Sequence, residues 1–326
     1  MASRYLPTDY LYISARIRAL EASLISGERL NALLELSAEE IPAALAADGL
    51  SAGERTDLES LLDQMLATAF ETVEAGLPDR SATLFLRYPN DCNNIKIIEK
   101  CRIRGIDPLP LLSPLGRVAP EALIEALEKG ETDALPSHMA SALPLAREAF
   151  AATGSPRDID LILDRACALD VRDAASPFPF AARLSAMRSD LINISTLLRI
   201  TRALRGEEAR SLLEAALLPT GTLSPELLLS LFGESETAIA AALARTPYVG
   251  LLDEPGISFD ALDRRADALL MREIKEAGHA PFGIEVVFAY LLATQQVAKN
   301  LRLLVALKKG GKDAQTVRES MRDCYV

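Results

Sequence analysis

Three segments of this chain share a pattern in which an asparagine is followed by apolar residues at helical spacing, then by basic residues and a glycine. The asparagines are Asn94, Asn193 and Asn300, and they lie 99 and 107 residues apart in a chain of 326 residues. This period is too long for helical solenoids, whose repeats span about 20 to 45 residues. The pattern therefore predicts three similar compact units, of which the last is abbreviated.

A second landmark follows the first two asparagines in the same order. Both copies read Leu-x-Pro-x-Gly-x-x-x-Pro-Glu, first at 112–121 and again at 217–226. The third copy lacks this landmark and offers Gly310 and Gly311 before a helix predicted at 315–321. We therefore expect repeat domains at about 1–115, 116–220 and 221–326. The structural positions of the repeat are Asn94, Asn193, Asn300, Pro114, Gly116, Pro219 and Gly221.

The amino-acid composition predicts the secondary structure of these units. The chain has 51 Ala and 55 Leu, only 10 Val and no Trp. Ala and Leu are strong helix formers, whereas β-branched and aromatic residues favour strands, so we predict an all-α fold. Helix starts are predicted at Ser224-Pro225 and at the capping boxes 37–40 and 51–54. Proline and glycine predict breaks at Gly76–Pro78, Pro89, Gly105–Pro114, Gly154–Pro156, Pro177–Pro179, Thr246–Gly250 and Gly278–Gly283.

Each repeat asparagine is expected to begin a helix whose apolar residues face a core, and to act as a cap or a buried hydrogen-bonding residue. The basic residues after it predict a short positive stripe on another helix face. Alternatively, they are solvated charges that favour the helix C-terminus. As candidate partner-binding residues we take Lys96, Lys100, Arg102, Arg104, Arg199, Arg202, Arg205, Arg302, Lys308 and Lys309.

Net charge restricts the class of partner. The chain carries −11 overall, but residues 294–326 carry +4, which leaves about −15 on the rest. An acidic protein repels phosphate backbones, so we expect no nucleic-acid partner. The uncharged apolar stretch 286–298 has 13 residues, fewer than the roughly 20 that span a bilayer, so we expect no transmembrane segment.

The sequence offers no recognisable catalytic or metal-binding motif. His138 and His279 lie 141 positions apart and are expected at loops or helix ends. Gly310-Gly311-Lys312 is followed by Asp313 where a phosphate loop needs Ser or Thr. We expect no catalytic residue, metal, cofactor or small-molecule substrate. The four cysteines lack CxxC spacing and are expected to be reduced: Cys92, Cys101, Cys167 and Cys324. Basic neighbours of Cys92 and Cys101 favour a lowered thiol pKa, but buried helical cysteines are usually inert.

Taken together, these segments resemble a known family. The opening Tyr10-Leu-Tyr-Ile-Ser-Ala-Arg-Ile-Arg-Ala-Leu-Glu21, the three asparagine segments, the Pro/Gly landmarks and the stretch Pro281–Tyr290 are similar to the C subunit of the V-type (A/V-type) ATP synthase and to the d subunit of eukaryotic V-ATPases. Two features depart from the family pattern. Ser14 stands where the family often has Asn, and the third copy lacks the Pro/Gly landmark.

This resemblance implies a fold and a role. The fold would be a funnel of three similar helical domains around a pseudo-threefold axis, peripheral on the cytoplasmic face of the membrane. The family is non-catalytic and seats the central shaft, made of the D and F subunits, on the membrane proteolipid ring, so that torque is transmitted for proton or sodium transport. On this reading the positive stripes help to form the surface that receives the shaft or rests on the ring.

Two other readings stay open from the residues alone. One is a stand-alone helical scaffold that binds a helix or peptide of an unrelated complex. The other is an all-α enzyme without a recognisable motif, which predicts a pocket with convergent titratable groups. Purification with a membrane ring and a coiled-coil shaft would separate the first from the rotary reading.

Overall fold

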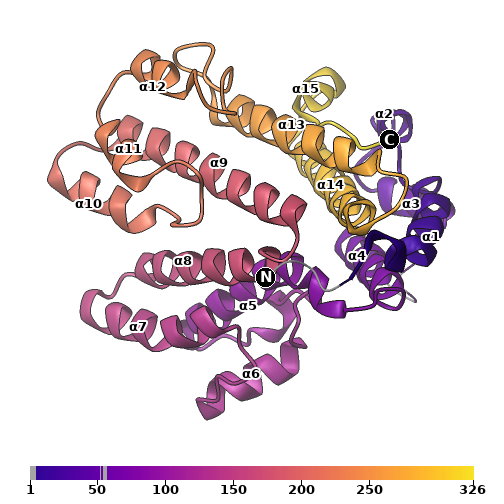
Figure 1. The fold of residues 1–326 in the computed structure, drawn as a ribbon, viewed down its shortest axis with the longest axis horizontal. Helices are drawn as coiled ribbons and strands as arrows, with labels where there is room; N and C mark the ends of the chain where they lie inside the picture. The colour runs from indigo at the N-terminus through magenta and orange to yellow at the C-terminus, as the bar shows by residue number, and fades with distance from the viewer. Residues whose placement is uncertain (1–4, 52, 54–56) are drawn as a thin grey trace. The chain divides into compact units, whose positions relative to one another are not determined.

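The computed structural model describes residues 5–51, 53 and 57–326, and within these residues the secondary structure is helical, with no strand (Figure 1). The prediction of an all-α fold is confirmed. The chain divides into two compact units. One runs from Ser81 to Ile257, and the other joins the N-terminal residues up to Arg80 with Ser258–Val326. The division into three repeat domains remains a prediction.

The unit 81–257 is built on antiparallel helices that follow one another closely along the chain. Its α-helices are α5 (Leu84–Arg104), α6 (Pro120–Lys129), α7 (Ser137–Thr153), α8 (Pro156–Ala175), α9 (Pro179–Ala203), α10 (Glu207–Ala216), α11 (Pro225–Ser230) and α12 (Glu236–Leu243). Short 3-10 helices are η2 (Arg80–Thr83), at its start, and η3 (Leu109–Leu111). Helices α5 to α8 share one apolar core, which includes Ile95, Leu127, Met139 and Leu163. Helix α9 packs against α8 and α10.

The second unit is assembled from both ends of the chain. Its helices are η1 (Pro7–Tyr10), α1 (Leu11–Glu21), α2 (Gly27–Leu33), α3 (Ile41–Ala47), α4 (Leu58–Glu74), α13 (Phe259–Gly278), α14 (Ile284–Lys309) and α15 (Ala314–Ser320). Helices α1, α4 and α13 pack against α14. Because α14 is surrounded, its residues 286–294 are buried all round, as expected of a core helix. Among the described helices, none is both long and apolar enough to cross a bilayer.

Most predicted helix boundaries are confirmed. Ser224 caps α11 by accepting from the Leu227 N–H, and Pro225 occupies the first turn. The Ser37 N–H donates to the Glu40 carboxylate at 2.8 Å, which is one half of the capping box predicted there. The box predicted at 51–54 lies partly outside the described residues. The predicted break at Pro89 is wrong, because Pro89 lies inside α5, where burial of the helix outweighs the lost backbone bond.

The prediction that each repeat asparagine begins a helix is also wrong. Asn94, Asn193 and Asn300 lie in the interiors of α5, α9 and α14. The helices extend upstream because the preceding residues, such as Leu86 and Leu184, also bury apolar side chains. The asparagines therefore cap no helix and must find hydrogen-bond partners elsewhere.

Candidate functional site

The three repeat asparagines make the same pair of hydrogen bonds, each to the backbone of one residue on a following segment. Asn94 Nδ2 donates to the Ser113 carbonyl at 2.8 Å, and the Ser113 N–H donates back to Oδ1 at 2.9 Å. Asn193 pairs in this way with Leu218, at 3.0 and 2.8 Å. Asn300 pairs with Arg322, at 3.0 and 2.9 Å. All three asparagines are buried, so the interpretation as buried hydrogen-bonding residues is confirmed.

The prolines of the landmark help to shape these pairs. Ser113 and Leu218 stand directly before Pro114 and Pro219. A residue before proline is restricted to extended backbone. Since an extended residue turns its N–H and C=O toward the same side, a single side-chain amide can bind both. We call each such pair of bonds an asparagine clamp.

Two buried aspartates extend the clamp in the first two copies. Asp91 accepts from the N–H groups of Arg117 and Val118 at 3.0 and 3.2 Å. In the second copy, Asp190 accepts from Thr222 and Leu223 at 2.8 and 2.9 Å. In each copy the aspartate lies three residues before the asparagine, on the same helix face. The aspartate and asparagine together therefore fix a loop to the middle of a helix.

The landmark glycines are required by this close approach. A Cβ at Gly116 would lie 2.3 Å from Asp91 Oδ1, and one at Gly221 would lie 2.0 Å from Asp190 Oδ1. Neither distance is compatible with a real side chain, so any other residue would push the carboxylate away. The repeat positions Pro114, Gly116, Pro219 and Gly221 thus serve one local structure.

In the second copy, side-chain hydroxyl groups also donate hydrogen bonds to the aspartate. Tyr248 Oη donates to Asp190 Oδ2 at 2.6 Å, and the Thr222 hydroxyl donates to the same oxygen. Burial and this carboxylate raise the pKa of Tyr248 well above its ordinary value. In the first copy, burial raises the pKa of Asp91, against the two N–H bonds that favour its ionised form.

Sequence reasoning missed the role of Asp91 and Asp190. The signal was present, because both copies have aspartate three residues before the asparagine, whereas the third has Val297. This difference also explains why the third copy dispenses with the Pro/Gly landmark. Because the third copy has no carboxylate at this position, it needs no glycine to make room for one. Instead, Arg322 reaches Asp260 and Asp267 of α13 at 3.2 and 3.0 Å and holds the C-terminal segment there.

Most of the predicted stripe residues are bound within the chain. Lys96 and Lys100 of α5 pair with Asp164 and Asp160 of α8, at 2.7 and 2.5 Å. Arg102 pairs with Glu99 of its own helix at 2.5 Å. The two lysine pairs join neighbouring helices, and all three contacts reduce the net charge that the first stripe presents.

Most basic residues of the other two stripes are also bound within the chain. Arg202 binds Glu236 at 2.8 Å, and Arg205 binds backbone carbonyls at the end of its own helix, as the alternative reading of helix-end charges expects. Arg302 reaches Glu59 and Asp63 of α4, and Lys308 donates to the Leu34 carbonyl. Arg199 is exposed and donates to Ser195. The exposed residues Arg104 and Lys309 remain at the ends of α5 and α14.

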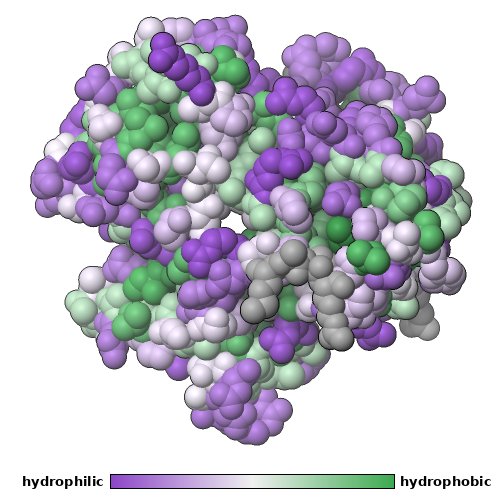
Figure 2. Space-filling view, viewed as in Figure 1, coloured by the Kyte–Doolittle hydropathy of each residue, from purple (hydrophilic) through white to green (hydrophobic). Residues whose placement is uncertain are grey.

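An exposed apolar segment begins in the last turn of α5 and continues beyond the helix. Ile103, Ile106, Leu109 and Leu111 are 39 to 57 % exposed within nine residues, next to Arg104. Single exposed apolar residues are ordinary, and the face in Figure 2 shows hydrophobic and hydrophilic residues side by side. A run of four is unusual and marks this segment as a candidate contact surface.

Buried charge in the first unit is confined to structural contacts. The Glu99 carboxylate is 2 % exposed and receives two hydrogen bonds from Arg147 of α7, at 3.0 and 2.6 Å. Asp170 of α8 accepts from the N–H groups of His138 and Met139 and so satisfies the first turn of α7. His138, as expected, lies at a helix end, and His279 follows α13 directly.

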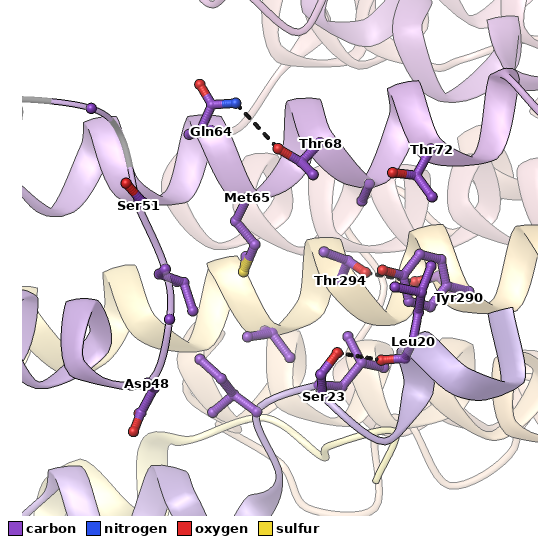
Figure 3. A pocket seen from close by; sticks show the side chains of 17 residues that line it. Leu20, Ser23, Asp48, Ser51, Gln64, Met65, Thr68, Thr72, Tyr290 and Thr294 are labelled. Atoms are coloured by element: carbon purple, nitrogen blue, oxygen red, sulfur yellow. Dashed lines mark hydrogen bonds between the residues drawn. The ribbon is translucent and has the colours of Figure 1, made fainter. Parts of the chain in front are cut away.

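A pocket of about 570 Å³ lies in the second unit between α1, α4, α14 and the residues 48–51 and 53 (Figure 3). Its polar lining is mostly hydroxyl and amide groups, several of which bond locally: Thr294 to the Tyr290 carbonyl, Ser23 to the Leu20 carbonyl and Gln64 to Thr68. The charged residue Asp48 is bound by Arg29. The described lining offers no convergent set of acid, base and nucleophile, and the described residues hold no cluster of three metal-ligating side chains.

Comparison with known proteins gives a consistent result over almost the whole chain. Residues 13–320 match the family model described as ATP synthase (C/AC39) subunit. The chain is 22 % identical to the C subunit of the V-type sodium ATPase of Enterococcus hirae, over 97 % of this chain and 99 % of the relative. It is 25 % identical to the C subunit of the A-type ATP synthase of Pyrococcus abyssi, over 96 % and 90 %. It is 24 % identical to the C subunit of the V-type ATP synthase of Thermus thermophilus, over 96 % and 98 %.

Proposed function

This chain belongs to the ATP synthase (C/AC39) subunit family, and we propose that it is the non-catalytic central-stalk subunit that joins the D and F shaft to the membrane proteolipid ring of a rotary V-type ATPase. The observation that carries the proposal is the match of residues 13–320 to that family, with relatives of similar length. A match along the whole chain favours a dedicated subunit over a stand-alone scaffold. The protein would sit on the cytoplasmic face of the membrane complex without a span of its own.

The clamps are suited to a part that transmits torque. Such a part must resist relative movement of its helices and loops under load. Each clamp ties a loop to the centre of a helix through buried hydrogen bonds, which are costly to break because their groups would lose all partners. The close-packed Ala/Leu core adds low compressibility. Neither feature requires a reactive group.

We further propose that each unit contributes a partner-binding surface of its own, the first through the segment after α5 and the second through the exposed basic end of α14. In the first unit, Ile106 and Leu111 supply apolar area next to the positive charge of Arg104. In the second unit, the exposed Lys309 supplies positive charge at the end of α14. Interfaces commonly combine an apolar centre with charges that set register. The internally paired Lys96, Lys100, Arg202 and Arg302 contribute mainly to the stability of the chain itself.

The first test is assembly. The purified chain should bind a complex of the D and F subunits and, together with them, a detergent-solubilised proteolipid ring in a pull-down. Failure of the wild-type chain to bind either partner would contradict the proposed role.

The second test concerns the surface. Arg104→Glu combined with Lys309→Glu should weaken assembly, more strongly at low salt, because exposed charges are screened by ions. The matched control is Arg157→Glu with Arg245→Glu, which makes the same charge change at other exposed positions. If both double variants assemble as the wild type does, the basic helix ends are not part of the interface.

A further inference from the structure

Cys92 of α5 and Cys167 of α8 are partners in the core of the first unit. They are 2 and 9 % exposed, and both lie at the contact between α5 and α8. Cys92 Sγ lies 3.6 Å from the Leu163 carbonyl, and Cys167 Sγ lies 3.8 Å from the Tyr88 carbonyl. Each sulfur thus reaches the helical turn that precedes the other cysteine. This reciprocal arrangement directs the two side chains at each other across the contact between α5 and α8.

The surroundings of Cys92 favour its protonated thiol. The Cys167 thiol and burial raise the pKa of Cys92 well above its usual value, and they outweigh the opposing charge of Lys96. Lys96 acts in the direction expected of a basic neighbour, but its effect on the pKa of Cys92 is the smaller one. Lys96 is itself held by Asp164 at 2.7 Å, and Cys92 Sγ lies 4.0 Å from the same carboxylate oxygen. All four cysteines are free thiols in this structure.

We propose that Cys92 and Cys167 form a redox-sensitive pair, which a small peroxide converts to a disulfide that links α5 to α8. Two thiols facing each other across packed helices need only a small adjustment to reach the Cβ separation of about 3.5 to 4.5 Å that a disulfide requires. Cys167, the more exposed of the two, is the first to react.

The chemistry balances without another cofactor. The Cys167 thiolate attacks one oxygen of hydrogen peroxide, the O–O bond breaks, and a sulfenic acid and hydroxide form; the proton lost from Cys167 turns that hydroxide into water. Cys92 then attacks the sulfenic sulfur, an S–S bond forms, and the departing hydroxide takes the Cys92 proton as a second water. The two thiols are oxidised by two electrons, and the peroxide is reduced to two waters.

The link would act on the part of the molecule that carries the first asparagine clamp. Asp91 and Asn94 lie within one turn of Cys92 on α5. A disulfide that closes the chain between positions 92 and 167 restricts the unfolded state and holds α5 on α8. Oxidation is therefore expected to stabilise the first unit and stiffen its clamp, whatever partners the protein has.

The test uses the full chain with Cys101→Ala and Cys324→Ala, which keeps only the proposed pair. After treatment of the folded protein with hydrogen peroxide, intact mass should fall by two hydrogen atoms, peptide mapping should find Cys92 linked to Cys167, and the thermal midpoint should rise by several degrees. Dithiothreitol should reverse all three changes. Adding Cys167→Ala is the control and should abolish the link.

Persistence of both thiols in the folded protein, or oxidation of each to sulfinic acid without a link, would overturn the proposal. If the double variant does not fold, peptide mapping of the peroxide-treated wild-type chain tests the proposal instead. A link between Cys92 and Cys167 supports the pair, whereas links that involve Cys101 or Cys324 instead contradict it.

Discussion

The side-chain amide of Asn94 binds both the N–H and the C=O of Ser113, 19 residues further along the chain, at 2.9 and 2.8 Å. Asn193 and Asn300 repeat this relationship with Leu218 and Arg322. A backbone pair that is removed from water needs both partners, and one amide side chain supplies them in the required geometry. Each asparagine therefore fixes one backbone residue of a following segment to the interior of its helix.

Replacing Asn94 by Ala should lower the free energy of unfolding by about 3 kcal/mol, because two backbone groups of Ser113 lose their partners. Urea unfolding followed by circular dichroism measures this loss. The control is Asn93→Ala, one residue earlier on the same helix and exposed, which should change stability by less than about 0.5 kcal/mol. Equal stabilities of the two variants would show that the clamp contributes little.

Gly116→Ala should cost about 2 kcal/mol, because its Cβ would lie 2.3 Å from Asp91 Oδ1. Gly27→Ala is a suitable comparison, since a Cβ there meets Cys324 at an ordinary 3.7 Å. The cost should shrink in an Asp91→Ala background, where the carboxylate is gone, and a double-mutant cycle from urea unfolding measures this coupling. An unchanged cost would mean that the glycine serves another purpose.

Arg147→Ala should destabilise the protein by about 3 kcal/mol, because it removes two of the hydrogen bonds to the buried Glu99 carboxylate. Arg102 contacts the same carboxylate, but its side chain is 54 % exposed. Arg102→Ala should therefore cost less than about 1 kcal/mol. Thermal and urea unfolding of the two variants compare a buried and an exposed partner of one acid, and the reverse order would refute this assignment.

Tyr325 should make stability depend on pH in the alkaline range. Burial, together with the hydrogen bond to Glu21 at 2.8 Å, raises its pKa from 10 to about 12. The folded protein holds this proton more tightly than the unfolded chain does, so the contribution is complete below pH 10 and is lost as pH rises from 10 toward 12. Urea unfolding at several pH values should show the advantage of the wild type over Tyr325→Phe shrinking in this window. Tyr12→Phe, at a 70 % exposed position, should show no such trend.

Sequence patterns identified the repeat and its landmarks, but they did not reveal which contacts require these residues. The spacing of Asn94, Pro114 and Gly116 identified the right residues, and the Ala and Leu content predicted the helices correctly. The helix start predicted at Asn94 was wrong because a proline at position 89 is a strong local signal for a break, while the burial that overrides it depends on α8 and the rest of the core. The stripes were likewise judged from charge spacing, whereas their carboxylate partners, such as Asp164, lie far away in sequence.

The sequence by itself determined the helical class, the repeat and the family, because these follow from local propensity and from the order of motifs along one chain. Only the tertiary structure decided what the motifs do: that Asp91 needs Gly116 beside it, that Lys96 is bound by Asp164, and that Cys92 and Cys167 each reach the helical turn before the other. Such pairings depend on distances between segments many residues apart. Those distances are set by how whole helices pack, which no short window of sequence records.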